Sequence, residues 1–382
     1  MTSLYTYPAV GFVRAVGVGV KAWFWCSMLL LFLQPVKAGA FSPSEDVHDP
    51  VPIMAYYYIW YDEDSWDRAK TDYSVLGRYS SDDRSVMEQH VRWAKEAGIG
   101  GFIVSWKSTP VLDRRLEQLL AVAAANDFSI WVIYQGLDFY RKPLPIGRVN
   151  RDLKHFINAY ADHPALRMYD RPVVIWSGTW EFSAKDVATV SKRYRDQVYL
   201  LASERNVRGY LRLAKFVDGN AYYWSSVNPD TYPGYQEKLD EMGGAVHEHG
   251  GIWVAPAAPG FDARLIGGTT VVERKGGETL RRQLNAAVRS SPDVVGLISW
   301  NEFSENSHIE PGETYGKRAL ELLANRKNGV VKATGVDSSD PGTTDPRNFY
   351  GLSVLGGLVL FVGGSIALAV TRHLGTTPRS NV

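Results

Sequence analysis

The middle of the chain alternates between two kinds of segment, and this alternation restricts the fold more than any other feature. Short runs rich in β-branched and aromatic residues are each followed by a longer stretch in which apolar residues recur at helical spacing. The sixth unit is the weakest, because Gly243 and Gly244 interrupt its candidate helix at 232–249. The runs expected as strands are 53–58, 101–106, 130–134, 172–176, 198–202, 219–224, 252–255 and 294–300. The other expected helices are 85–97, 112–125, 152–161, 184–195, 279–289 and 315–324.

Eight such β/α units in about 290 residues predict an α/β fold, a single closed (β/α)8 TIM barrel. An open, doubly wound sheet would usually carry a glycine-rich phosphate turn after its first strand, and the sequence has neither G-x-G-x-x-G nor a Walker motif. We therefore expect residues 41–327 to form one folded domain.

The residues before this domain have the pattern of an export signal. Arg14 and Lys21 precede the apolar run 22–33, and the small residues of the segment 38–40 match a signal-peptidase site. Residues 1–40 are therefore expected to be a signal peptide. An uncleaved anchor helix is the alternative, although extending the apolar run backwards would bury Lys21.

The residues after the domain predict a stalk and a membrane anchor. Residues 328–348 are rich in Gly, Ser, Thr, Asp and Pro, as a linker is. The uncharged stretch 349–370 is long enough, at about 1.5 Å per helical residue, to cross the roughly 30 Å core of a bilayer. Arg372 and Arg379 lie in the tail 371–382, which the positive-inside rule places in the cytoplasm. The expected location is the cell membrane, single-pass, with the barrel outside the cell.

Composition excludes several kinds of partner and cofactor. The net charge of +1 provides no field for attracting nucleic acid. The only cysteine, Cys26, lies in the export signal, so the domain has no thiolate nucleophile and no cysteine-ligated metal. His247 and His249 stand in a polar, helix-like stretch and are expected to face solvent, so no metal and no cofactor are predicted. Lys107, at the end of the second strand, is expected as a polar substrate contact rather than a Schiff-base lysine.

The segment SWNEFSENSHIEP, residues 299–311, follows the last expected strand, and the active site of such a barrel lies where its strands end. Glycosidic cleavage needs a protonated carboxylic acid at the leaving oxygen and a second carboxylate across the reacting centre. Glu302 and Glu305 are the candidates, provided that the chain turns there, as in one helical turn. An exposed acidic loop with one carboxylate capping the next helix is the alternative. Glu310 is expected to support the pair from behind.

Four segments together resemble one enzyme family. WNEFSENSHIEP, followed by Tyr315-Gly316, is similar to the W-N-E-W-H-E-G-T-Q-I-E segment of the glycoside hydrolase family 99 endo-α-mannosidases. AYYYIWYD at 55–62, AKEAGIGGFIVSW at 94–106 and PGFDARLI at 259–266 are similar to further segments of that family, in the same order. The resemblance covers nearly the whole predicted barrel.

The resemblance implies a retaining, endo-acting hydrolase of an oligosaccharide or polysaccharide. Glu302 matches the glutamate that deprotonates the sugar 2-hydroxyl to form a 1,2-anhydro intermediate, and Glu305 matches the general acid and base. No metal or cofactor is implied. The sugar-binding positions of the family carry over to Tyr57, Trp60, Trp106, Tyr223, Arg264 and Asn301.

The chain also departs from the family pattern. Where the family usually has Trp, His, Gly and Gln, this chain has Phe303, Ser304, Asn306 and His308, and after the third strand it reads Gln-Gly-Leu at 135–137 in place of H-x-E. These departures bear on the mannoside specificity more than on the chemistry. Two alternatives therefore stay open: a non-catalytic glycan-binding surface protein on a hydrolase scaffold, and a barrel hydrolase of another α-linked glycan.

Overall fold

The computed structural model describes residues 51–327. The expected signal peptide at 1–40, linker at 328–348, membrane helix at 349–370 and tail at 371–382 lie outside the described residues. Within 51–327, no helix combines the length and the apolar composition that a membrane span requires.

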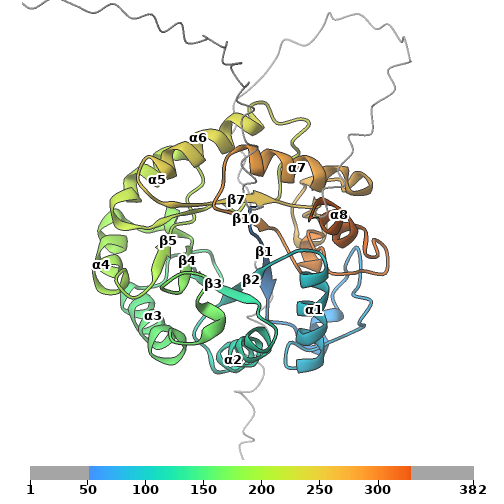
Figure 1. Ribbon diagram of the computed structural model, residues 1–382, viewed down its shortest axis with the longest axis horizontal. Coiled ribbons are helices and arrows are strands. Elements are labelled where there is room, and N and C mark those ends of the chain that lie inside the picture. The colour runs from blue at the N-terminus through green and yellow to red at the C-terminus, as the bar shows by residue number, and fades with distance from the viewer. Residues whose placement is uncertain (1–50, 328–382) are drawn as a thin grey trace, which may run out of the picture. The chain divides into compact units, whose positions relative to one another are not determined.

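Parallel strands close into a barrel with helices around it (Figure 1). Hydrogen-bonded neighbours follow the order β5-β4-β3-β2-β1-β10-β7-β6. The ends of this series are joined through Ala202, whose N–H donates to the carbonyl of Gly219 at 2.9 Å and whose carbonyl accepts from Ala221 at 2.8 Å. The barrel strands are β1 (Ile53–Tyr58), β2 (Gly101–Trp106), β3 (Ser129–Gln135), β4 (Val173–Ser177), β5 (Tyr199–Leu201), β6 (Gly219–Ala221), β7 (Ile252–Ala257) and β10 (Val294–Leu297).

A helix follows each barrel strand, which confirms the predicted (β/α)8 barrel. Local signals start two of these helices: Thr109 caps α2 ahead of Pro110, and Ser183 forms a capping box with Asp186 at α4. The helices are α1 (Arg84–Glu96), α2 (Pro110–Ala125), α3 (Ile146–Tyr160), α4 (Ala184–Tyr194), α5 (Val207–Leu213), α6 (Tyr235–His247), α7 (Glu278–Arg289) and α8 (Arg318–Lys327).

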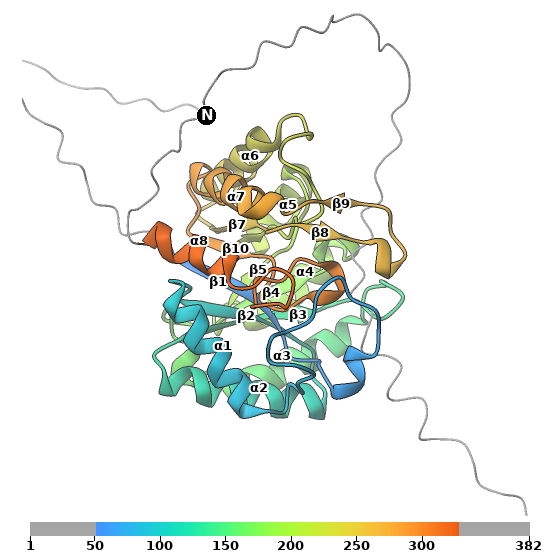
Figure 2. The ribbon, with the colours of Figure 1, turned by 90° about the vertical axis from the view of Figure 1, so that its right-hand side faces the viewer.

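Most of the remaining short elements lie in the loops at the carboxyl ends of the strands. β8 (Phe261–Asp262) and β9 (Val271–Val272) form an antiparallel pair after β7. In the side view, this pair and the long loop after β1 lie toward the same end of the barrel (Figure 2). Single 3-10 turns are η1 (Glu63–Trp66), η2 (Pro164–Leu166), η3 (Thr179–Glu181), η4 (Ala214–Phe216), η5 (Arg264–Ile266), η6 (Lys275–Gly277) and η7 (Phe303–Glu305).

Alternation along β1 divides the core into two layers. Met54 and Tyr56 pack inside the barrel, whereas Ala55, Tyr57 and Ile59 pack against the surrounding helices. Successive side chains of a strand point to opposite faces, so this division follows from the strand geometry. It also decides which tyrosine of the AYYYIWYD segment can reach the active end.

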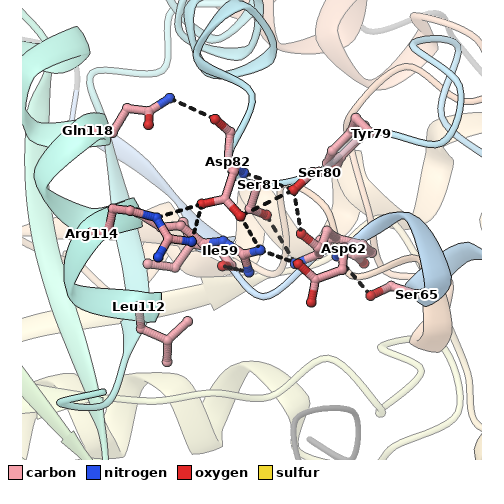
Figure 3. A network of polar contacts seen from close by, with 12 residues as sticks. Ile59, Asp62, Ser65, Tyr79, Ser80, Ser81, Asp82, Leu112, Arg114 and Gln118 are labelled. Carbon is pink, nitrogen blue, oxygen red and sulfur yellow. Dashed lines mark hydrogen bonds and ion pairs between the residues drawn. The ribbon is translucent and has the colours of Figure 1, made fainter. Parts of the chain in front are cut away.

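The loop after β1 is fixed to α2 by one buried arginine, Arg115. Figure 3 shows the polar contacts around Asp62 and Asp82, the two carboxylates of this loop that the arginine binds. The Arg115 side chain is 2% exposed and donates to the carbonyl of Ile59 at 3.1 Å, to Asp82 at 2.7 Å and to Asp62. Two carboxylates and a carbonyl offset the cost of burying the guanidinium. In the sequence, Trp60 lies between Ile59 and Asp62, two of the residues that Arg115 binds. The position of Trp60 therefore depends on the contacts of Arg115.

Candidate active site

The segment after β10 folds back on itself in a closed loop. Ser299 donates its N–H to the carbonyl of Ser307 at 2.7 Å, and Glu310 donates its own to the carbonyl of Trp300 at 2.8 Å. The 3-10 turn η7 lies within the segment that these two hydrogen bonds close. The chain therefore makes the turn that the sequence predicted, and both glutamates belong to it.

Backbone contacts fix the two glutamates individually. The N–H of Glu302 donates to Ser299 Oγ at 2.8 Å, and Glu302 Oε1 accepts from the N–H of Ser304 at 3.1 Å. Asn306 ends the turn in the left-handed region, at φ 51° and ψ 33°. Asparagine is among the few residues other than glycine that adopt this conformation readily, which explains how this chain keeps the turn with Asn where the family pattern has Gly.

Burial shifts the acidity of both carboxyls in the same direction. Glu302 is 5% exposed and Glu305 is 4% exposed. Desolvation raises the pKa of Glu302 to about 7, against hydrogen bonds from Ser304. Desolvation and the neighbouring Glu302 together raise the pKa of Glu305 well above its usual range. Because the two carboxyls interact, they titrate as a pair, and the charge of Glu302 favours retention of the proton on Glu305.

Both glutamates line a cavity at the carboxyl ends of the strands. Tyr58 and Tyr223 meet beside them, with their hydroxyl oxygens 2.6 Å apart. Trp60 packs on the ring of Tyr58, with ring centroids 4.2 Å apart. Flat amphipathic rings beside buried carboxyls suit a sugar ring. The remaining lining residues are Ser105, Trp106, Lys107, Thr109, Leu112, Ile133, Gln135, Leu137, Asp138, Phe139, Arg141, Ser177, Trp180 and Ser203.

Three of the six expected sugar contacts line this cavity: Trp60, Trp106 and Tyr223. Trp106 does so from the end of β2, where its Nε1 donates to Asp113 at 2.9 Å. Lys107, expected as a polar substrate contact, lines the cavity as well.

Tyr57 does not line the cavity, which corrects the expectation that it contacts sugar. Its ring stacks on Phe102 in the layer between strands and helices, and its hydroxyl lies 3.0 Å from His90 Nδ1. Tyr58, the next residue on β1, points the other way and lines the cavity. Successive side chains of a strand point to opposite faces, and in a run of three tyrosines the sequence does not show which of them face the site.

Asn301 and Arg264 also lie away from the cavity lining. Asn301 is fully buried and pairs with the backbone of Tyr58 at 2.8 and 2.9 Å, so it sets the position of that tyrosine rather than lining the cavity. Arg264 is bound through its guanidinium to Asp262, and its side chain is 66% exposed. It borders a separate hollow near β9 and the start of α8.

A layer of polar contacts supports the turn that carries Glu302 and Glu305. Arg274 donates to the carbonyls of Asn306 and His308 at 3.1 and 2.7 Å, and to His308 Nδ1 at 3.2 Å. Burial and Arg274 lower the pKa of His308 to about 3, so its neutral ring donates from Nε2 to Asp72 at 3.1 Å. Glu310, which was expected to support the pair, accepts from Tyr79 at 2.9 Å and from Ser74.

The cavity includes several residues that the sequence reading did not select. Gln135, Arg141, Trp180 and three serines come from strand ends and irregular loops, where no periodicity shows which side chains face inward. The sequence signal that could have found some of these cavity residues is the recurrence of polar residues at the predicted strand ends, where Gln135 and Asp138 stand.

Among the described residues, no group of three or more His, Cys, Asp or Glu side chains could hold a metal ion. His247 lies 3.1 Å from Asp293, and His249 Nδ1 lies 2.9 Å from the carbonyl of Ala245.

A closed (β/α)8 barrel with two buried carboxyls on one turn after its last strand, in an aromatic cavity, has the site architecture of a glycoside hydrolase. Residues 61–327 match the family model described as Glycosyl hydrolase family 99, and the chain belongs to this family.

Relatives and solved structures agree with this assignment. The chain is 23% identical to the glycoprotein endo-alpha-1,2-mannosidase of Rattus norvegicus over 274 residues, and 24% identical to a glycoprotein endo-alpha-1,2-mannosidase-like protein of Danio rerio over 296 residues. These matches cover 64% and 70% of this chain, but only 57% and 66% of those proteins. The fold is similar to that of a family 99 endo-alpha-mannosidase from Bacteroides thetaiotaomicron, with a TM-score of 0.65, 19% identity, and coverage of 73% of this chain and 97% of that one.

Proposed function

We propose that this chain is a retaining, endo-acting glycoside hydrolase of α-linked glycans, similar to endo-α-mannosidases, with Glu302 and Glu305 as its catalytic pair. The observation that carries the proposal is the buried turn, which places two interacting carboxyls with raised pKa values beside an aromatic cavity. Environments that separate the acidities of two carboxyls assign one as acid and the other as base.

The reaction uses the pair in two stages. Protonated Glu305 donates its proton to the glycosidic oxygen as the bond to the anomeric carbon breaks. Ionised Glu302 accepts the proton of the sugar 2-hydroxyl, whose oxygen then bonds to the anomeric carbon and gives a 1,2-anhydro sugar. Water opens this ring, with Glu305 taking a proton from the water and Glu302 returning one to the 2-oxygen, so both groups regain their starting states.

Kinetics of Gln variants test the assignment. Glu302→Gln and Glu305→Gln are each expected to lower turnover by roughly 100- to 10,000-fold while keeping ligand binding, because Gln preserves shape but cannot exchange the proton. Glu310→Gln is expected to have a milder effect, and the exposed Glu313→Gln serves as the control. Turnover is measured on α-linked manno-oligosaccharides and on an aryl α-mannoside with a good leaving group.

Leaving-group dependence separates the two roles. The loss in Glu305→Gln should largely disappear on the aryl substrate, which departs without protonation, whereas Glu302→Gln should remain slow on both. Equal, modest losses at Glu302, Glu305 and Glu310 on both substrates would show that the turn is structural. Glycan binding by the wild type without turnover of any α-linked glycan would favour the glycan-binding protein instead.

We further propose that the barrel is exported and anchored in the cell membrane by residues 349–370. The support is the apolar character of that stretch and the basic tail after it. Protease added to intact cells should remove the barrel and leave a small anchored remnant. Protection of the barrel until the cells are lysed would contradict this orientation.

A further inference from the structure

The loop between β3 and α3 carries two neighbouring aromatic side chains at its tip, Phe139 and Tyr140. Tyr140 is 77% exposed and Phe139 is 54% exposed, and among the described residues they are the two most exposed large apolar side chains. A single exposed apolar side chain is common on a protein surface and needs no explanation. Two adjacent ones that exceed all others in exposure form an aromatic tip, and its position indicates what it binds.

The aromatic tip borders the cavity that holds Glu302 and Glu305. Phe139 belongs to the lining of this cavity, whereas Tyr140 lies outside the lining. The two rings are neighbours, with centroids 5.5 Å apart and planes inclined at 82°. The aromatic surface therefore continues from the wall of the cavity to the outside of the barrel.

Backbone hydrogen bonds hold the aromatic tip in place. The N–H of Asp138 donates to the carbonyl of Lys142 at 2.8 Å, and the N–H of Lys142 donates to Asp138 Oδ1 at 2.9 Å. One step further from the tip, the N–H of Leu144 donates to the carbonyl of Gly136 at 2.9 Å. A ligand that stacks on the tip therefore has little backbone to order, which favours its binding.

The chemistry of the aromatic tip suits the face of a sugar ring. An aromatic ring presents an apolar face, and the C–H groups of a pyranose can cover that face while the sugar hydroxyls stay in water. The same kind of surface continues inside the cavity, where Trp60 packs on the ring of Tyr58. An endo-acting hydrolase holds sugars on both sides of the cleaved bond, so its substrate has to pass over the rim of the cavity.

We propose that Phe139 and Tyr140 form a stacking platform for a further sugar of the bound glycan, outside the sugars that flank the cleaved bond. The enzyme then selects long chains over short ones. The inference rests on the proposed function, because the platform receives a glycan that is already bound in the cavity. A sugar is favoured over other occupants because Phe139 is part of the cavity lining itself.

Binding is measured by isothermal titration calorimetry on the full chain carrying Glu302→Gln, so that the ligand is not cleaved. The probes are two series, α-linked manno-oligosaccharides and α-linked gluco-oligosaccharides, each from disaccharide to hexasaccharide. In at least one series, the affinity should rise by roughly three- to ten-fold at the length that reaches the platform, which is the size expected of one aromatic stacking contact.

Further variants locate this gain in affinity. Tyr140→Ala and Phe139→Ala should each remove most of the gain, whereas Tyr140→Phe keeps the ring and should keep the gain. Tyr232→Ala is the matched control, because it removes an aromatic ring that is 41% exposed and lies outside the cavity lining. Its gain with chain length should equal that of the parent.

An affinity that does not rise with chain length would overturn the platform. A rise that survives in both Tyr140→Ala and Phe139→Ala would leave the aromatic tip to another partner, such as a lipid surface, and would also overturn it.

Turnover by the wild type separates this result from the proposed function. Cleavage of these glycans with a kcat/KM that does not depend on chain length would refute the platform alone. Length-dependent binding that requires Tyr140, without cleavage of any glycan, would refute the proposed function alone. Failure to bind or cleave any member of either series would contradict the proposed function and, with it, the platform.

Discussion

Burial of Glu302 and Glu305 sets their protonation states, and the same burial makes the folded protein sensitive to pH. An unfolded glutamate titrates near 4.5, whereas the pKa of folded Glu302 is about 7. Below about pH 4.5 both states hold the proton and there is no ionisation cost. As pH rises from there through 7, the folded state keeps protons that the unfolded chain has released, so stability falls.

Replacing either glutamate with Gln removes this ionisation cost. Glu302→Gln should therefore raise the free energy of unfolding relative to wild type near pH 8, by at most about 3.4 kcal/mol, and have little effect near pH 4. Glu305→Gln should change it in the same direction. Thermal unfolding across this pH range measures the difference, with exposed Glu313→Gln as the control. A difference that does not vary with pH would show that the burial of these carboxyls has no ionisation cost.

At the scale of single residues, the sequence indicated which residue types build the site better than it indicated where each side chain points. The spacing of Glu302 and Glu305 called for a turn, and the structure supplies one in η7. The sequence analysis chose Tyr57 as a sugar contact, but Tyr58 is the tyrosine that lines the cavity. In a run of three tyrosines, nothing in the sequence shows which side chain points into the barrel. Asn301 was selected as a sugar contact, although its side chain is used to hold the backbone of Tyr58.

The elements themselves were largely predictable, since each strand and most helices carry their own periodicity. The doubtful unit was the sixth, because of two glycines, yet α6 forms there. A Cβ on Gly243 would lie 2.8 Å from the carbonyl oxygen of Ser290, so glycine permits close packing of this helix. The last strand ends at Leu297 rather than residue 300, although Ile298 and Trp300 still donate to the carbonyls of Ala257 and Tyr56 at 2.8 and 2.7 Å before the chain turns through η7.

An element-scale prediction concerns Arg115, the arginine that fixes the loop after β1 to α2. Arg115→Met should lower the free energy of unfolding by roughly 3 kcal/mol, because it removes a buried cation that bonds two carboxylates and a carbonyl. It should also raise KM, since the loop carries Trp60 into the cavity. Chemical denaturation and steady-state kinetics measure the two effects.

The adjacent arginine provides a matched control. Arg114 also pairs with Asp82, at 2.6 Å, but its side chain is 56% exposed. Arg114→Met should therefore cost at most about 1 kcal/mol and leave KM unchanged. Equal losses in the two variants would show that burial of Arg115 adds nothing to the ion pair.

For the chain as a whole, the count of β/α units was enough to predict barrel closure, but not the contents of the cavity. Closure follows from general rules for parallel strands and their crossovers. The cavity is built by loops from several strands, and residues such as Arg141 and Trp180 reach it through irregular backbone that local sequence does not encode as a pattern.

The final prediction is that residues 41–327 fold and work without the remainder of the chain. Barrel closure, the turn with Glu302 and Glu305, and its supporting contacts all lie within 51–327, and the family match ends at 327. The fragment should be soluble, unfold cooperatively and turn over glycan at the rate of the full-length protein.

A shorter fragment that ends at residue 317 tests how sharp this boundary is. It removes α8, whose Leu320 and Leu323 are 6% and 1% exposed and belong to the core. Exposing two buried leucines costs about 1.5 to 3 kcal/mol each, a large part of the stability of an ordinary domain. The shorter fragment should therefore unfold at a lower temperature or aggregate. If instead 41–327 is insoluble while the full-length protein is stable in detergent, the barrel needs residues beyond this boundary.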